Sequence, residues 1–87
     1  MKRVFKWDIE KNEKLTKERG ISFEMISKSI EDGGLLDIID HPKRLNQQLL
    51  VVKVRDYAVL VPFVESEDDI FFKTAYPSRK FTKKYLR

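Results

Sequence analysis

The sequence contains no cysteine, one histidine, three glycines and three prolines. Without cysteine, neither a disulfide nor a thiolate metal site can stabilise the fold, and the composition fits a reducing compartment. No apolar run approaches the roughly 18 residues that a membrane-spanning helix needs. Met1–Trp7 is basic but no apolar segment follows it. We therefore expect no signal peptide and a cytoplasmic location.

Several common catalytic signatures are also missing. The chain has no Gly-x-Ser-x-Gly nucleophile turn, no phosphate-binding Gly-x-x-x-x-Gly-Lys loop and no Gly-x-Gly-x-x-Gly. Metal-dependent hydrolysis needs several carboxylates or histidines around one cation. Asp37 and Asp40 are three apart on a predicted strand, so they should point to opposite faces. We expect neither a metal nor an organic cofactor.

Positive charge is in excess and unevenly spread. Lysine and arginine number 18 against 14 acidic residues, which gives a net charge of +4. An acidic run, Glu65–Asp69, is followed by a segment without acids that carries Lys73, Arg79, Lys80, Lys83, Lys84 and Arg87. Such asymmetry attracts a polyanion to one face of a protein. A solvated basic tail that only aids solubility is the alternative interpretation.

Helix signals dominate the first third of the chain, after a short strand at Lys2–Trp7. Asp8 is placed to cap a polar helix over Ile9–Arg19, and Gly20 suits the left-handed residue just past its end. Ser22 begins a second helix, whose apolar residues Phe23, Ile26 and Ile30 recur at helical spacing. The pair Gly33-Gly34 ends this helix.

The rest of the chain alternates with a period of two. Strands are predicted over Leu35–Asp40, Leu49–Arg55, Ala58–Glu65 and Ile70–Tyr76, and a helix over Ser78–Tyr85. In the second strand, Leu50, Val52 and Val54 point one way, and Val51, Lys53 and Arg55 the other. A tight turn is predicted at Asp56-Tyr57. Pro62 suggests a bulge or an edge position.

This order predicts a single α+β domain over residues 1–87. Strands that follow a run of helices favour a twisted antiparallel sheet, with the two N-terminal helices packed on one face. The other face is then expected to be open and to carry Lys53 and Arg55. Phe71 and Phe72 are adjacent on a strand, so one of them should lie outside the main core.

Cations and phenols remain as candidates for chemistry. The cluster comprises Lys53, Arg55, Lys73, Tyr76, Arg79, Lys80, Lys83 and Tyr85. Metal-free RNA cleavage can use such groups, because the 2′-hydroxyl of the substrate attacks the adjacent phosphate. The protein then supplies a base, cations for the charge on phosphorus, and an acid for the leaving oxygen. Basic terminal helices also occur in many proteins that never contact RNA.

The segment Phe5–Met25 resembles the N-terminal signature of BrnT-type ribonuclease toxins. That signature is approximately Phe-x-Trp-Asp-x-x-Lys-Asn, a polar helix, and then Gly-Ile-Ser-Phe-Glu. The matching residues, in order and spacing, are Trp7, Asp8, Lys11, Asn12, Gly20, Ile21, Ser22, Phe23 and Glu24. After Gly34 the similarity is looser and consists of an Asp-rich strand, a His-Pro turn, a hairpin, and a last strand leading into a basic helix.

The resemblance implies a RelE-like fold and a translation-inhibiting ribonuclease from a bacterial toxin–antitoxin pair. It also implies a cognate BrnA-type antitoxin, through which the complex represses its own operon at operator DNA. The sequence departs from the family at two positions. The family often has His before the Gly, where this chain has Arg19, and often ends its last strand with Ser-Ala-Arg, where this chain has Thr74-Ala75-Tyr76. Arg79 or Lys80 could replace the cation missing after Ala75.

These observations predict a metal-independent endoribonuclease toxin. The catalytic candidates are Arg79 and Arg55 for phosphate charge, and Lys80, Lys73 or Tyr76 for proton transfer. Lys53, Lys83 and Lys84 are the candidates for RNA binding. The alternative is a non-catalytic module of the same fold that binds RNA or only a protein partner. An acidic antitoxin segment is expected to cover the basic stretch from Lys73 to Arg87.

Overall fold

The computed structural model describes residues 4–86, which form three helices and six strands. In chain order they are β1 (Val4–Trp7), α1 (Ile9–Arg19), α2 (Phe23–Glu31), β2 (Leu35–Asp40), β3 (Gln48–Val54), β4 (Tyr57–Glu65), β5 (Asp69–Phe72), β6 (Tyr76–Pro77) and α3 (Arg79–Leu86). The α+β class and the order of elements confirm the prediction. Lys2 and Arg3 of the predicted first strand lie outside the described residues, as does Arg87.

The two N-terminal helices begin and end where their caps require. The Asp8 carboxylate accepts a hydrogen bond from the Lys11 backbone N–H at 3.1 Å, and Gly20 is left-handed with φ 67°. The Ser22 hydroxyl oxygen accepts from the Met25 N–H, also at 3.1 Å. Each cap satisfies a backbone group that a helix end leaves free, so short-range sequence determines both helices.

The sheet is mixed, and the prediction of a purely antiparallel sheet is wrong. Its strand order is β1-β5-β4-β3-β2, with β6 also beside β4, and β1 runs parallel to β5 with Trp7 opposite Phe72. The aromatic side chains explain this position. Phe5 stacks on Phe72 at 5.1 Å between ring centroids, and Trp7 stacks on it at 6.0 Å. Burying these rings draws the first strand to the edge beside β5.

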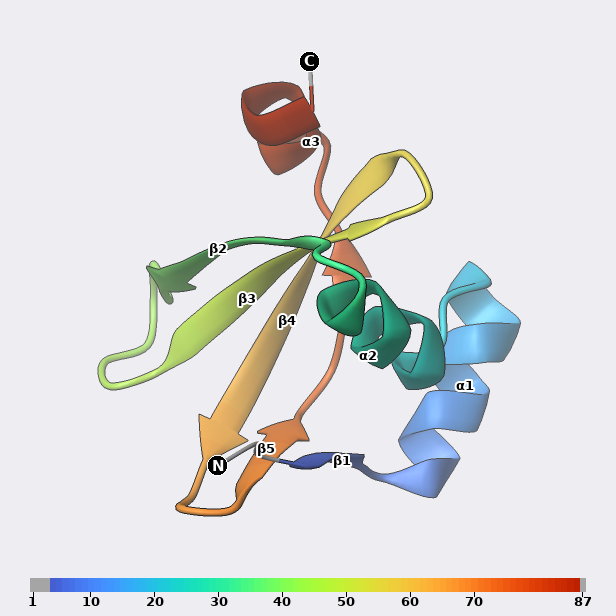
Figure 1. Cartoon of the computed structure of the whole chain (residues 1–87), viewed down its shortest axis with the longest axis vertical. Helices are drawn as coiled ribbons and strands as arrows, with labels where there is room; N and C mark the ends of the chain where they lie inside the picture. Colours follow the sequence, from blue (N-terminus) through green and yellow to red (C-terminus); the bar gives the residue numbers. More distant parts are fainter. Residues whose placement is uncertain (1–3, 87) are drawn as a thin grey trace.

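The main core lies between α2 and one face of the sheet. Phe23 and Ile26 of α2 are fully buried against Leu50, Val52 and Val54 of β3, which confirms the predicted inward set. Figure 1 shows α2 against the strands and α1 farther from them. Among its residues α1 buries only Leu15, so most of its surface faces solvent.

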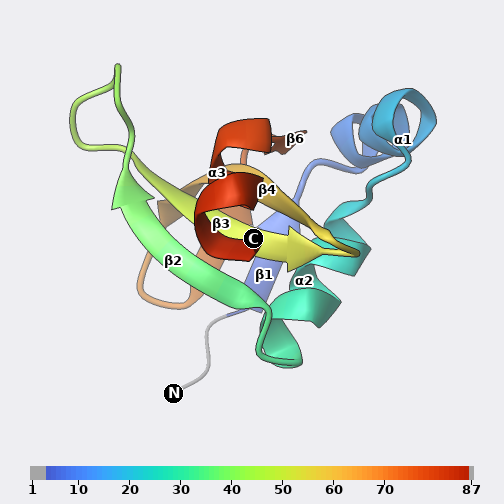
Figure 2. The same ribbon diagram turned by 90° about the horizontal axis from the view of Figure 1, so that it is seen from above.

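The sequence suggested that the second face of the sheet would be open. This prediction is wrong, because α3 covers part of that face. Leu49, Val51 and Leu60 form a second buried cluster with Phe81 and Tyr85 of α3. In the view of Figure 2, α3 lies across β3 and β4. The reason is that Leu49 and Val51 make both faces of β3 apolar, and such a strand must be covered on both sides.

The segment predicted as one strand over Ile70–Tyr76 is two strands separated by a break. Along β4, Leu60 is the last partner of β6, and Phe63 is the first partner of β5. Pro62 lies at this gap, so a central strand tolerates a residue without an N–H. Its carbonyl accepts a hydrogen bond from the Lys73 N–H at 2.8 Å. Pro62 is therefore not on an edge strand, but the irregularity predicted as the alternative is present, because residues 73–75 lie opposite only Val61 and Pro62.

Candidate functional site

The structure distributes the sequence-predicted site residues over four surfaces. Lys53 and Arg55 line a groove of about 480 Å³ beside the end of α2. Lys73 borders a hollow of about 350 Å³ next to the loop before β3. Tyr76 lines a third groove, of about 270 Å³, against α1. The exposed face of α3 carries Arg79, Lys80, Lys83 and Lys84.

The groove beside α1 contains cations that the sequence analysis did not select. Lys11, Lys14 and Arg19 border it together with Glu18, and Tyr76 lies on the opposite side, in the segment that leads into α3. Lys11, Lys14 and Glu18 recur at the spacing of one helical face. This spacing was the available signal, but nothing in the sequence indicated which element that face would meet.

A side-chain clamp fixes α1 in the position that forms this groove. The amide oxygen of Asn12 accepts a hydrogen bond from the Phe23 N–H, and its amide nitrogen donates to Glu24 Oε1, both at 2.7 Å. The bond from Asn12 is the main cause that lowers the pKa of Glu24 below its ordinary value. Four residues of the BrnT-like signature, Asp8, Asn12, Ser22 and Phe23, thus have structural roles as caps, clamp or core.

Tyr76 connects the groove to the second cluster. It pairs with Leu60 in the sheet, packs against the residues under α3, and is half-buried. The residue before it, Ala75, is buried in the main core. Tyr76 is therefore held by backbone pairing and by packing, and it borders a groove lined by three cations. A phenol placed in this way can give or accept a proton at a bound phosphate ester.

Buried hydrogen bonds hold α3 rigidly on the sheet. The Thr82 hydroxyl, which is 2% exposed, accepts from the Ala58 N–H at 2.9 Å and donates to the Ser78 carbonyl at 2.6 Å. Ser78 caps the helix by accepting from the Phe81 N–H at 3.2 Å. The four cations are consequently presented on a fixed row, and none of them forms an ion pair within residues 4–86. Such a row suits a polyanionic backbone.

A hydrogen bond between α3 and the edge strand β2 adds a pH-sensitive contact. The Tyr85 hydroxyl donates to Asp37 Oδ2 at 2.5 Å. This bond, helped by the Ile38 N–H, lowers the pKa of Asp37 below its ordinary 3.8. The same bond raises the pKa of Tyr85 above its ordinary 10.0, because it favours the neutral hydroxyl.

The stability contributed by this bond should disappear at both pH extremes. A depressed carboxyl pKa stabilises the fold above the unfolded pKa, and the contribution is lost as pH falls through the folded value. A raised phenol pKa stabilises the fold below the unfolded pKa, and that contribution is lost as pH rises. We expect Tyr85→Phe to lower Tm by a constant amount between about pH 5 and pH 9. The difference should shrink outside that window and vanish below the folded pKa of Asp37 and above the folded pKa of Tyr85. Calorimetric Tm values measured across this pH range test the prediction, with Tyr57→Phe as the control variant. A Tm difference between Tyr85→Phe and the unaltered protein that persists at about pH 2 contradicts it.

The described part of the chain offers no metal site and no membrane helix. Within residues 4–86, no group of three His, Cys, Asp or Glu side chains is placed to hold a metal ion. No helix in that range is long and apolar enough to cross a membrane.

The His41 ring nitrogen Nδ1 accepts hydrogen bonds from the N–H groups of Lys43 and Arg44 at 3.0 and 3.2 Å, so His41 orders its own loop.

No protein-family model matches the chain, and no curated protein matches it. The function must therefore be inferred from the residues and their arrangement.

Proposed function

We propose that this protein is a metal-independent endoribonuclease toxin of the BrnT type, with a RelE-like fold, which cuts RNA at the groove between α1 and Tyr76. The observation that carries the proposal is that Lys11, Lys14 and Arg19, together with Glu18, line one groove with the half-buried Tyr76. Three cations and one phenol supply the charge and the proton-transfer group that cleavage by the 2′-hydroxyl requires.

The two positions that depart from the BrnT signature lie at the same groove. Arg19 stands where the family often has His, and Tyr76 stands where it often has Arg, and both residues line the same groove. The cation that is missing after Ala75 is thus supplied from α1. The groove thus keeps both a cation and a proton-transfer group, but here the cation lies on α1 and the proton-transfer group follows Ala75.

The cleavage step assigns a role to each side of the groove. The 2′-oxygen attacks phosphorus and loses its proton, the bond from phosphorus to the 5′-oxygen breaks, and the leaving oxygen gains a proton. Water takes the proton of the 2′-hydroxyl, the Tyr76 phenol donates its proton to the leaving 5′-oxygen, and water then reprotonates the phenolate. The planar fork of Arg19 donates two parallel bonds to the phosphoryl oxygens, and Lys14 adds positive charge. The products are a 2′,3′-cyclic phosphate and a 5′-hydroxyl.

The remaining predicted residues hold RNA outside the groove or meet the antitoxin. The row on α3 begins three residues after Tyr76, so a strand in the groove can continue along Arg79 and Lys83. An acidic antitoxin segment would compete for the same row. Phe71 is 41% exposed beside Val64, which is 53% exposed, and offers the antitoxin an apolar contact.

The decisive experiment is RNA cleavage by the purified protein in excess EDTA. We expect the rate to be unchanged by the chelator and the 5′ fragments to end in 2′,3′-cyclic phosphate. Loss of cleavage on chelation, or fragments ending in a 3′-hydroxyl, would refute the mechanism. RNA binding without cleavage, and no growth arrest on induced expression, would identify the chain as a non-catalytic binding module instead.

A further inference from the structure

Arg55 has a backbone conformation that arginine rarely adopts. Its φ is 59°, and within residues 4–86 the only other non-glycine residue with positive φ is Asn46. Asparagine tolerates this region through its short polar side chain, whereas a long side chain is strained there. The Arg55 guanidinium is exposed and bonds to no described residue. Arg55 is the first of the two residues that join β3 to β4, and a hairpin turn of this length uses a positive φ at that position. The turn requires the backbone conformation but not a long cationic side chain, so the guanidinium is free to meet a ligand.

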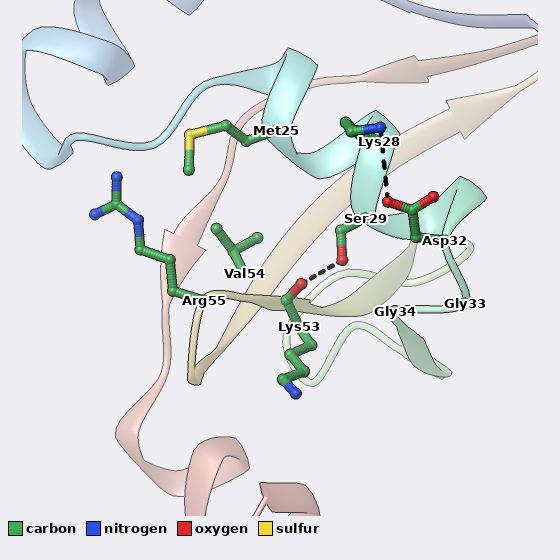
Figure 3. A pocket seen from close by; sticks show the side chains of 9 residues that line it. All are labelled: Met25, Lys28, Ser29, Asp32, Gly33, Gly34, Lys53, Val54 and Arg55. Atoms are coloured by element: carbon green, nitrogen blue, oxygen red, sulfur yellow. Dashed lines mark hydrogen bonds and ion pairs between the residues drawn. The ribbon is translucent and has the colours of Figure 1, made fainter.

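Arg55 stands at the rim of a groove whose floor is rigid. The Ser29 hydroxyl donates to the Lys53 carbonyl (Figure 3). The Lys53 N–H donates to the Gly34 carbonyl at 2.8 Å. The Gly34 N–H donates to the Ser29 carbonyl at 2.6 Å. A Cβ on Gly34 would lie 2.0 Å from Ser29 Oγ, so only glycine allows this close junction. The end of α2 and the β3–β4 turn are thereby locked together.

The walls of the groove combine one free cation with an apolar surface. Figure 3 shows Arg55 extending on the side of Met25, whereas Lys53 extends away from it. Lys28 is paired with Asp32 at 3.8 Å, so Arg55 is the cation available to a ligand on that side. A guanidinium binds phosphate oxygens in a bidentate manner, and a methionine sulfur packs well against an aromatic ring. The volume of about 480 Å³ is in the range of small-ligand sites.

We propose that this groove is a subsite for one nucleotide of single-stranded RNA, with its phosphate on Arg55 and its base against Met25. The subsite is separate from the groove beside α1, and it serves to hold the strand rather than to cut it. The inference rests on the proposed function for one point, which is that the ligand is RNA. It does not depend on cleavage, because the subsite only binds the strand.

Binding of a 2′-O-methyl RNA oligonucleotide of about ten nucleotides tests this subsite. The blocked 2′-oxygen prevents cleavage, so fluorescence anisotropy measures affinity for the unaltered protein. We expect Arg55→Gln and Arg55→Gly each to weaken binding about tenfold and to reduce the salt slope by about 0.7. Arg55→Gly should also raise Tm by about 2–4 °C, because glycine relieves the strained φ.

Two control variants separate the subsite from general effects. Arg44→Gln removes the same charge from the loop before β3, and Asn46→Gly changes the other positive-φ residue. Both should bind the oligonucleotide as tightly as the unaltered protein. The subsite is refuted if the unaltered protein does not bind, if neither Arg55 variant weakens binding, or if only Arg55→Gly does. Failure of cleavage with a preserved Arg55 effect would refute the proposed function and leave the subsite standing.

Discussion

Replacing Tyr76 by phenylalanine is expected to lower the rate of RNA cleavage by about 10²- to 10³-fold, because the reacting oxygens lose their proton-transfer group. The ring remains, so the packing of Tyr76 under α3 should be kept and Tm should change little. Single-turnover cleavage of a labelled RNA measures the chemical step directly. Tyr85→Phe is the matched control, since its hydroxyl bonds to Asp37 and does not border the groove.

Arg19 provides an independent test of the same groove. Arg19→Ala should reduce the cleavage rate about 10²-fold, and Arg19→Lys should recover only part of it, because an ammonium cannot donate two parallel bonds. Lys17→Ala, on the same helix but outside the groove, should cleave normally. If Tyr76→Phe and Arg19→Ala both cut RNA at the rate of the unaltered protein, the active site lies elsewhere.

Replacing Phe72 by alanine is expected to lower the free energy of unfolding by about 3–5 kcal/mol. Phe72 is 1% exposed, and the rings of Phe5, Trp7 and Phe23 surround it with centroids 5.1 to 6.0 Å away. Removing the ring leaves a cavity at the junction of β1, β5 and α2. A small domain is stable by only about 5–15 kcal/mol, so much of the population should unfold at modest denaturant concentrations.

The neighbouring phenylalanine gives a control of the same size and chemistry. Phe71 is 41% exposed, so Phe71→Ala should change the free energy of unfolding by about 1 kcal/mol or less. Urea unfolding followed by circular dichroism compares the two variants without relying on Trp7 fluorescence. Equal losses from both variants would mean that the rings around Phe72 do not form the centre of the core.

Local sequence was sufficient for the helices and for the inward face of β3. Asp8, Gly20 and Ser22 define helix ends through contacts with residues at most four positions away. The alternation of Leu50, Val52 and Val54 was also readable, because side chains alternate along any strand. The sequence predicted that one of Phe71 and Phe72 lies outside the main core, but it could not indicate which ring lies inside. That depends on how β5 registers against β1 and β4.

Only the tertiary structure decided where the strands and the cations would lie. The parallel pairing of β1 with β5 joins segments more than 60 residues apart, and no local pattern specifies such a contact. The same is true of the groove, because Arg19 of α1 and Tyr76 of β6 line it together although they lie far apart in the sequence. The position of α1 depends on the hydrogen bond between Asn12 and Phe23, and the position of Tyr76 on its pairing with Leu60. Sequence determined which residues carry charge and which caps begin each helix, since these depend on neighbours along the chain. Long-range packing of aromatic and aliphatic side chains determined which of those charges face the same space.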